Sequence, residues 1–296
     1  MNPLKYITHI SLACLYALAL LGAPHGHAQC SGLSQGQMAQ ALSWSGKPVV
    51  GDTYKVKSWY VQDGDSLSLA NGHRLRLGQV NTTEMASKGR PEQEYAQQGK
   101  DHLKQKLHQQ EVIYLQLLPE IKDHYGRWLV KLYDGAGMSA EAFLVAQGLA
   151  YVISMNGQGA ENCLWQQEEV ARRQGLGIWQ APISRVREAA SLSSNQGGFM
   201  RMSGAVTDIS ESQQHWYIGL GEKIAIKIPK DVLVASRFKI STPKQLERWI
   251  GQAVTARGWL AWRKLSKKQR EKGFKAGVMS IDHLRMLEQG PVASNN

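Results

Sequence analysis

The chain has 296 residues, of which 43% are apolar and 20% are charged. This composition is typical of a globular protein, and it excludes an intrinsically disordered chain, a collagen and a multi-span membrane protein. At about 150 residues per domain, the length favours two domains.

The chain is basic, with 35 Lys and Arg against 24 Asp and Glu and a formal net charge of +11. The excess is uneven, because residues 181–296 hold 19 basic and 9 acidic residues whereas residues 52–180 hold 14 basic and 15 acidic ones. A polyanionic partner such as DNA or RNA is therefore expected to bind the C-terminal part. The composition indicates no protein partner.

The N-terminus has the features of a secretory signal peptide. Lys5 precedes an apolar stretch over residues 10–23, and Gly26-His27-Ala28 offers small residues for cleavage. We expect residues 1–28 to be removed and the mature protein, with no transmembrane span, to be periplasmic or secreted. The alternative, an uncleaved membrane anchor, is disfavoured because the apolar stretch is short for a bilayer.

Removal of the signal peptide takes Cys14 with it and leaves two cysteines, Cys30 and Cys163. Two cysteines in an exported protein are more often paired than free, so we expect a disulfide between them. The alternative is that Cys163 is a small buried apolar residue and Cys30 a free thiol.

Alternation of apolar and polar residues predicts several strands after residue 53, as in residues 66–69 and 74–77. Further strands are predicted at 112–116 and 128–133, and helices after Pro91, at 140–147 and at 161–174. Strands with intervening and terminal helices favour a small barrel over a doubly wound sheet, giving a mainly β fold with helices (α+β) for residues 52–180.

Charged residues stand at unusual places within this pattern. Asp63 and Asp65 share a turn, Arg76 lies between two strand leucines, and Glu84 and Arg127 follow polar segments. Each alone is compatible with an ordinary turn or a solvated face. Together they offer oxygen ligands for a hard cation, two guanidinium groups for a phosphate and a carboxylate that can act as a base, which is the equipment for phosphodiester hydrolysis.

Residues 54–179 resemble the staphylococcal nuclease (thermonuclease) family. The resemblance is carried by the segments VQDGDSLSL, LRLGQVNTTE, DHYGRWLVKLY, LVAQGLA and ARRQGLGIW, in the order of the family. It implies an OB-fold barrel with three helices. It also implies that Arg76 and Arg127 bind the scissile phosphate, that Glu84 is the general base and that Tyr125 holds a neighbouring phosphate.

The same resemblance implies a Ca²⁺ site formed by Asp65, the side chain of Asn81 and the backbone carbonyl of Thr82. Asn81 matches a carboxylate in the family, and calcium affinity depends on ligand charge, so we expect a weakened site. The two tyrosines that sandwich a base in the family correspond to Ser154 and Asn156. The phosphate-binding residues are thus retained and the base-stacking ones are not.

A segment rich in Ser, Ala and Gly at residues 181–198 is expected to be a linker to a second domain, residues 199–291. There the pattern predicts strands at 200–206, 215–220 and 223–228, a helix at 243–250, and strands at 253–262 and 278–281. Three strands, a helix and two strands is the OB order, so a second small β-barrel is expected. Its residues resemble no family.

Between the last two of these strands, residues 263–275 form a basic segment, and Trp259 and Trp262 precede it. In an OB fold this connection commonly closes over nucleic acid, and an aromatic ring can stack on a base. The alternative is a solvated loop over two core tryptophans. The basic residues expected to bind nucleic acid are Arg263, Lys264, Lys267, Lys268, Arg270, Lys272 and Lys275.

The sequence therefore predicts an exported, metal-dependent nuclease that hydrolyses DNA, with RNA as a second candidate substrate. Two alternatives belong to other functional classes. One is a non-catalytic nucleic-acid-binding protein on a decayed nuclease barrel, which Asn81 would permit. The other is an envelope protein whose basic domain contacts anionic lipid or polymer.

Overall fold

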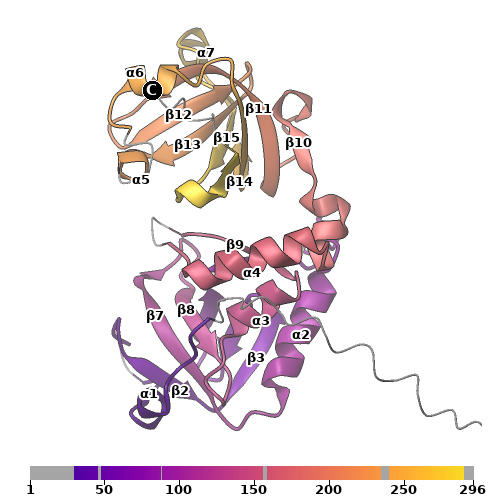
Figure 1. The fold of residues 1–296 in the computed structure, drawn as a ribbon, viewed down its shortest axis with the longest axis vertical. Coiled ribbons are helices and arrows are strands. Elements are labelled where there is room, and N and C mark those ends of the chain that lie inside the picture. The colour runs from indigo at the N-terminus through magenta and orange to yellow at the C-terminus, as the bar shows by residue number, and fades with distance from the viewer. Residues whose placement is uncertain (1–29, 46–47, 88, 156–158, 235–239, 290–296) are drawn as a thin grey trace, which may run out of the picture.

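A computed structural model describes residues 30–45, 48–87, 89–155, 159–234 and 240–289 of the chain. These residues form two β-barrels, one above the other in Figure 1. The predicted signal peptide, residues 1–28, lies outside the described residues. In the part of the chain that is described, no helix is long and apolar enough to cross a membrane.

The first barrel contains a seven-stranded sheet in the order β1-β2-β7-β8-β5-β4-β3. The strands β2 and β3 follow one another in the chain, and β2 pairs with β7 while β3 pairs with β4, so together they close the barrel. The pair β5–β8 is parallel, as the OB order requires. The strands are β1 (Leu42–Ser43), β2 (Thr53–Val56), β3 (Trp59–Asp63), β4 (Ser66–Leu69), β5 (Arg74–Leu77), β7 (Ile113–Lys122) and β8 (Trp128–Tyr133).

Helices cover this barrel where the apolar spacing predicts them. They are α1 (Gln35–Ala39), α2 (Ala96–His108), α3 (Ala140–Ala146) and α4 (Asn162–Arg173). Leu103 and Leu107 of α2 are fully buried, because residues four apart share one helix face. A two-stranded sheet of β6 (Val80–Thr82) and β9 (Ala150–Val152), absent from the sequence-based expectation, lies beside α4.

The predicted disulfide is confirmed. Cys30 and Cys163 are joined across 133 residues of chain, with an S–S distance of 2.05 Å. The bond ties the N-terminal end of the described chain to α4, and closing so long a loop stabilises the fold by on the order of 4 kcal/mol in a chain-entropy account.

The second barrel repeats the same topology. Its strands run in the order β11-β12-β13-β15-β14, and a further β11–β14 pairing closes the ring. The β13–β15 pair is parallel, so the predicted OB-like barrel is confirmed. The ring strands are β11 (Gly198–Glu211), β12 (His215–Leu220), β13 (Ile224–Pro229), β14 (Ala253–Trp262) and β15 (Gly277–Ser280); β16 (Leu287–Gln289) adds to β14, and the short helices are α5 (Lys230–Val234), α6 (Pro243–Glu247), α7 (Lys267–Glu271) and η4 (Leu284–Met286).

The segment 181–198, expected to be a linker, is built into the second barrel. It contains β10 (Val186–Glu188), which pairs in parallel with β11, between the short helices η2 (Pro182–Ser184) and η3 (Ala189–Ser191). Ala189 and Leu192 are buried. The small side chains of this segment predicted a flexible linker, but in the structure they permit close packing, because Ala189 lies against Gly204 of β11.

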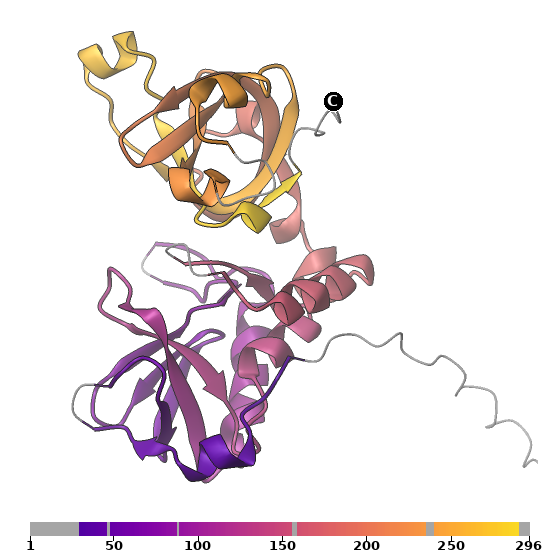
Figure 2. The same cartoon turned by 60° about the vertical axis from the view of Figure 1, so that its left-hand side comes forward.

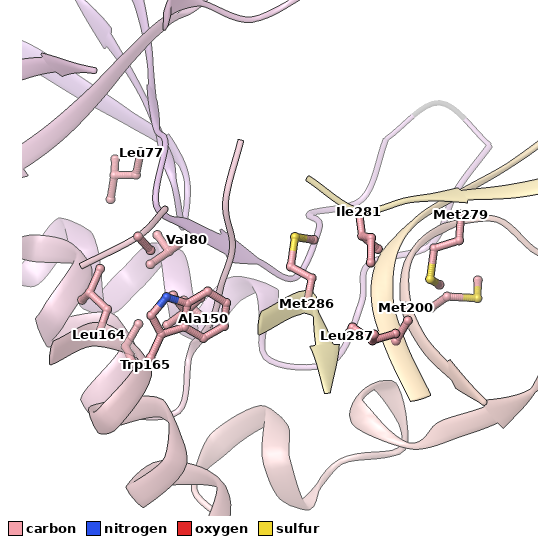
Figure 3. Packing of buried hydrophobic residues seen from close by; sticks show 14 of the residues in the cluster. Leu77, Val80, Ala150, Leu164, Trp165, Met200, Met279, Ile281, Met286 and Leu287 are labelled. Atoms are coloured by element: carbon pink, nitrogen blue, oxygen red, sulfur yellow. The ribbon is translucent and has the colours of Figure 1, made fainter. Parts of the chain in front are cut away.

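The two barrels share one continuous apolar core. Figure 3 shows Leu164 and Trp165 of α4 on one side of the boundary and Met286 and Leu287 on the other. The Trp165 ring stacks on His283, with 6.0 Å between the centroids. The second barrel is therefore packed against the first rather than tethered to it.

A buried ion-pair cluster crosses the same boundary. The Arg257 guanidinium of β14 donates two hydrogen bonds to the Glu168 carboxylate of α4, at 2.8 and 2.7 Å. Next to this contact, Arg201 of β11 donates to Glu288 at 2.6 Å and to the Ser184 carbonyl oxygen at 2.6 Å, both within the second barrel, and Glu288 lies 3.8 Å from Arg172 of α4. Arg257 is 2% exposed, so its charge depends entirely on these partners.

Replacing Arg257 tests how strongly this cluster holds the barrels together. Arg257→Met should lower the free energy of unfolding by about 3–5 kcal/mol, because the Glu168 carboxylate would stay buried without its cation. Urea unfolding followed by tryptophan fluorescence measures the change. Arg263→Met, at an exposed arginine of the same barrel, is the control, and the double variant Arg257→Met/Glu168→Gln should recover part of the loss. A loss no larger than that of the control would contradict the assignment.

Candidate nucleic-acid cleft

A cleft of about 430 Å³ lies where the first barrel meets the second. The first barrel contributes the β3–β4 turn, β5, β6 and the β7–β8 turn to its lining. The second barrel contributes the start of β11 and the last part of β14. The charged and polar residues among its lining include Asp63, Asp65, Arg76, Asn81, Thr82, Glu84, Arg90, Asp123, His124, Tyr125 and Arg127, and the aromatic ones from the barrel boundary are Tyr151, Phe199 and Trp259.

Arg76 is buried at the base of the cleft, 4% exposed. Its guanidinium lies 3.0 Å from the Asp65 carboxylate and donates to the carbonyl oxygens of Leu77 and Val80 and to Asn81 Oδ1. A mid-strand arginine is tolerated here because these acceptors satisfy its hydrogen bonds. Its position is consequently rigid.

The turn that carries Asp65 packs tightly on β6. Asp65 Oδ2 accepts hydrogen bonds from the backbone N–H and the hydroxyl of Thr82, at 2.9 and 3.1 Å. Gly64 is required between the two aspartates, because a Cβ there would lie 2.8 Å from Thr82 Oγ1. The Asp-Gly-Asp sequence thus places two carboxylates beside β6 at the cleft.

Arg127 is oriented by Asp123. Its Nε donates to Asp123 Oδ2 at 2.7 Å, its backbone N–H donates to Asp123 Oδ1, and its Nη1 donates to Ser66 Oγ at 3.1 Å. Burial alone would raise the pKa of Asp123, but the hydrogen bonds from Arg127 and from Tyr125 N–H outweigh it and leave the pKa below its usual range. The remaining N–H groups of Arg127 are free to meet an anion in the cleft.

Two further carboxyl groups are crowded in the cleft. Burial, followed by repulsion from Asp65 and then Glu84, raises the pKa of Asp63 to about 6. Burial and the charge of Asp65 also raise the pKa of Glu84, against the opposing effect of Arg76, Arg127 and Arg90. Glu84 is nevertheless exposed on its outer side, and its backbone is held by Gln93. A cluster of carboxylates that repel one another is the environment in which a cation is stabilised.

The expected calcium ligands lie together, and their oxygens have partners within the protein. Asn81 Oδ1 accepts from Arg76, and Asn81 Nδ2 donates to the Thr82 carbonyl oxygen at 3.1 Å. Among the described residues, Asp65 Oδ1 accepts from the Ser66 hydroxyl alone, at 3.0 Å. Amide, carbonyl and carboxylate oxygens are the ligand types that a hard cation takes, and Asp63 and Asp65 bring the negative charge.

Tyr125 stands at the rim of the cleft on the β7–β8 turn. Its side chain is 63% exposed. The His124 ring lies 3.7 Å from the Tyr125 ring between centroids, and the Arg127 guanidinium lies 5.6 Å from the centroid of the Tyr125 ring. Arg74 donates to the Tyr125 carbonyl oxygen at 2.7 Å, which ties this turn to β5. The phenol is thus available to a ligand that enters the cleft.

The structure therefore brings together seven of the residues singled out in the first barrel and leaves the basic segment apart from them. The seven are Asp65, Arg76, Asn81, Thr82, Glu84, Tyr125 and Arg127. The basic segment contains α7, which lies at the end of the second barrel away from the first (Figures 1 and 2).

Residues 74–181 match the family model of the staphylococcal nuclease homologue. The match begins at the first residue of β5 and ends after η1 (Gly177–Gln180), so it contains Arg76, Glu84 and Arg127 but not Asp63 or Asp65. This part of the chain is thus similar to a staphylococcal nuclease homologue, which is a nuclease-type or nucleic-acid-binding fold. The second barrel has no family match. A search of the curated proteins found no match to this chain.

Sequence reasoning missed the contribution of the second barrel to the cleft. Trp259, expected beside the basic segment, lines the cleft with Phe199, whereas Trp262 donates to the Gln196 carbonyl oxygen. Tyr151 was not singled out either. The available signal was the spacing of Trp259 two residues after Arg257, which places both side chains on one face of a strand.

Asp63 offers a test of the crowded carboxyl groups. A carboxyl group whose pKa is raised by folding destabilises the folded state once it is ionised, so its cost is full above about pH 6 and is lost as the pH falls toward 4. Asp63→Asn should raise the free energy of unfolding by about 1–3 kcal/mol at pH 7.5 and by less at pH 4.5. Urea titrations at the two pH values measure it, with Asp101→Asn on the exposed side of α2 as control. An equal effect at both pH values would show that folding does not raise the pKa of Asp63.

Proposed function

We propose that the protein is an exported, metal-dependent nuclease that hydrolyses phosphodiester bonds of DNA and RNA. One observation carries the proposal: two guanidinium groups held by carboxylates, Arg76 and Arg127, and the carboxylate of Glu84 line a single cleft. The match of residues 74–181 to a nuclease family agrees with this chemistry.

In the proposed reaction, Arg76 and Arg127 stabilise the negative charge that develops on the phosphate oxygens as water attacks. Both side chains are already held in place by hydrogen bonds, so little reorganisation is needed in the transition state. The two residues differ in their contribution. Arg76 uses most of its donors within the protein and supplies a buried positive charge, whereas Arg127 keeps donors for direct contact with phosphate.

Glu84 is proposed as the general base that accepts the proton of the attacking water. Its carboxylate stands at the open side of the cleft, and the Glu84–Gln93 backbone hydrogen bond holds the segment that carries it. Burial and the charge of Asp65 raise the pKa of Glu84, which makes its carboxylate a stronger base than an ordinary glutamate. Activity is expected to fall on the acid side as this group becomes protonated.

Ca²⁺ is the proposed cofactor, held by Asp65 with Asp63, Asn81 and Thr82 around it. When bound, such a cation supplies Lewis-acid stabilisation of the phosphate. Its charge would also relieve the repulsion among Asp63, Asp65 and Glu84. The amide of Asn81 brings no negative charge, so the site is proposed to be weak.

Export to the periplasm or medium is proposed from two features of the chain. Residues 1–28 have the pattern of a cleavable signal peptide, and a Cys30–Cys163 disulfide is stable only where thiols are oxidised.

The basic segment, residues 263–275, is proposed to hold the polyanion outside the cleft. Arg263, Lys264, Lys267, Lys268, Arg270 and Lys272 are exposed, whereas Lys275 pairs with Asp208 at 2.9 Å. Exposed lysines and arginines on one short helix and its flanks bind phosphates without sequence preference. This segment is separate from the proposed chemistry.

The nuclease proposal predicts that Glu84→Gln lowers the cleavage rate by roughly 10²–10⁴, because no group of similar basicity replaces it. Arg127→Met should cost on the order of 10²–10³, the usual loss for a charge-stabilising donor. Plasmid DNA and RNA incubated with Ca²⁺ or with a chelator measure the rates, and chelation should stop cleavage. Ile250→Ala, at an exposed site of the second barrel outside the basic segment, is the control. If DNA and RNA stay intact at all Ca²⁺ concentrations, the nuclease proposal is contradicted and the alternative, a non-catalytic nucleic-acid-binding protein, is favoured.

Asn81 offers a separate test of the cation site. Asn81→Asp should lower the Ca²⁺ concentration needed for half-maximal activity, since a restored carboxylate both attracts and ligates the ion. A Ca²⁺ titration of the cleavage rate measures the shift, and Asn71→Asp, in the β4–β5 turn, is the matched control. An unchanged Ca²⁺ dependence would place Asn81 outside the cation site.

A further inference from the structure

The second barrel contributes an aromatic pair to the cleft. Phe199 of β11 and Trp259 of β14 are directly opposite each other in the antiparallel ladder, and their ring centroids lie 4.9 Å apart at 69°. Both line the cleft, and both remain partly exposed. Partly exposed rings beside bound phosphates are the kind of surface on which nucleobases stack.

This pair is joined to the phosphate side of the cleft by a third ring. Tyr151 of β9 lies 5.1 Å from Phe199 between centroids, and in the β6–β9 ladder it stands opposite Asn81. Tyr151 is only 3% exposed, so its ring packs behind Phe199 and is not itself available for a nucleobase to stack on. The aromatic row therefore starts beside the proposed cation site and ends in the open part of the cleft.

The ion-pair cluster fixes where these rings lie. Side chains two apart on a strand share one face, so Phe199 and Arg201 of β11 point the same way, as do Arg257 and Trp259 of β14. Arg257 binds Glu168 of the first barrel at 2.7 Å. In Figure 1, β14 lies directly above β9 and α4. Docking of the barrels thus turns Phe199 and Trp259 toward the catalytic residues.

We infer that Phe199 and Trp259 form a nucleobase-binding surface, so that the second barrel is part of the substrate site and the enzyme prefers single-stranded polynucleotide. The inference rests on the proposed nuclease function. A base flanking the scissile phosphate stacks on the exposed ring faces while Arg76 and Arg127 face that phosphate. A paired base is already stacked within a duplex, so only an unpaired one can be received.

The test compares two ligands on the full chain carrying Glu84→Gln, so that substrate survives. The probes are a single-stranded thymidine oligonucleotide and an oligonucleotide of equal length built from abasic residues, with binding measured by fluorescence anisotropy. Trp259→Ala should weaken binding of the first by roughly fivefold to a hundredfold, the value of one base–aromatic stack, and leave binding of the second unchanged. Trp259→Phe should restore most of the loss.

Two controls separate stacking from damage to the fold. Trp259→Leu keeps apolar bulk without a ring and should behave like Trp259→Ala, with far-ultraviolet circular dichroism and unfolding midpoint close to those of the parent. Tyr60→Ala removes an exposed ring of β3 that lies outside both the cleft and the basic segment, and should leave both ligands unaffected. Equal binding of the thymidine oligonucleotide by Trp259→Ala and its parent, or an equal loss on the abasic probe, would overturn the inference.

Cleavage by the chain with Glu84 intact distinguishes this inference from the proposed function. Faster hydrolysis of single-stranded than of duplex DNA, with the ratio reduced by Trp259→Ala, supports both. Cleavage that shows no strand preference and no dependence on Trp259 overturns the inference but still supports the nuclease proposal. Base-dependent binding without cleavage overturns the nuclease proposal but still supports the stacking surface.

Discussion

The arrangement of the two barrels depends on the buried contact between Arg257 and Glu168. Both charges are removed from water, and only a bidentate geometry at 2.7–2.8 Å offsets the cost of that removal. The pKa of Glu168 is raised by its burial in spite of Arg257, which shows how strongly the environment disfavours an unpaired charge there. Such a contact tolerates little rotation between the barrels.

That constraint has a chemical consequence, because the strands that carry Arg257 and Arg201 also carry the rings of the cleft. The boundary of a two-barrel protein becomes a composite site, in which the first barrel supplies charged groups and the second supplies aromatic faces. By the resemblance, Ser154 and Asn156 correspond to the base-stacking tyrosines of the staphylococcal nuclease family. The proposed surface of Phe199 and Trp259 would restore a stacking site from a different domain.

Stability and the proposed chemistry oppose each other within the cleft. Burial and then the charge of Asp65 raise the pKa of Asp63 and of Glu84, and ionisation of these two groups at neutral pH disfavours the folded state. The disulfide and the shared core of the barrels stabilise the fold independently of these groups. A cleft that accumulates like charge is therefore compatible with a stable protein.

The sequence by itself determined the local features. Period-two alternation marked His215–Leu220 and Ala253–Trp262 with the ends that the structure has, and the charged residues of the first barrel stood in family order before any geometry was known. It also indicated the Cys30–Cys163 pair. These features follow from neighbours in the chain or from an ordered set of motifs, which a linear pattern records.

Only the tertiary structure decided how the barrels meet. The contact of Arg257 with Glu168 joins the two barrels at a sequence separation of 89, and the contact of Arg201 with Glu288 joins two strands of the second barrel at a separation of 87. The alternation of apolar and polar residues in a strand does not indicate which part of the protein packs against its outer face. For the same reason, the sequence predicted residues 181–198 as a linker and placed Trp259 with the basic segment. In the structure, β10 of the first segment pairs with β11, and Trp259 lines the cleft at the barrel boundary.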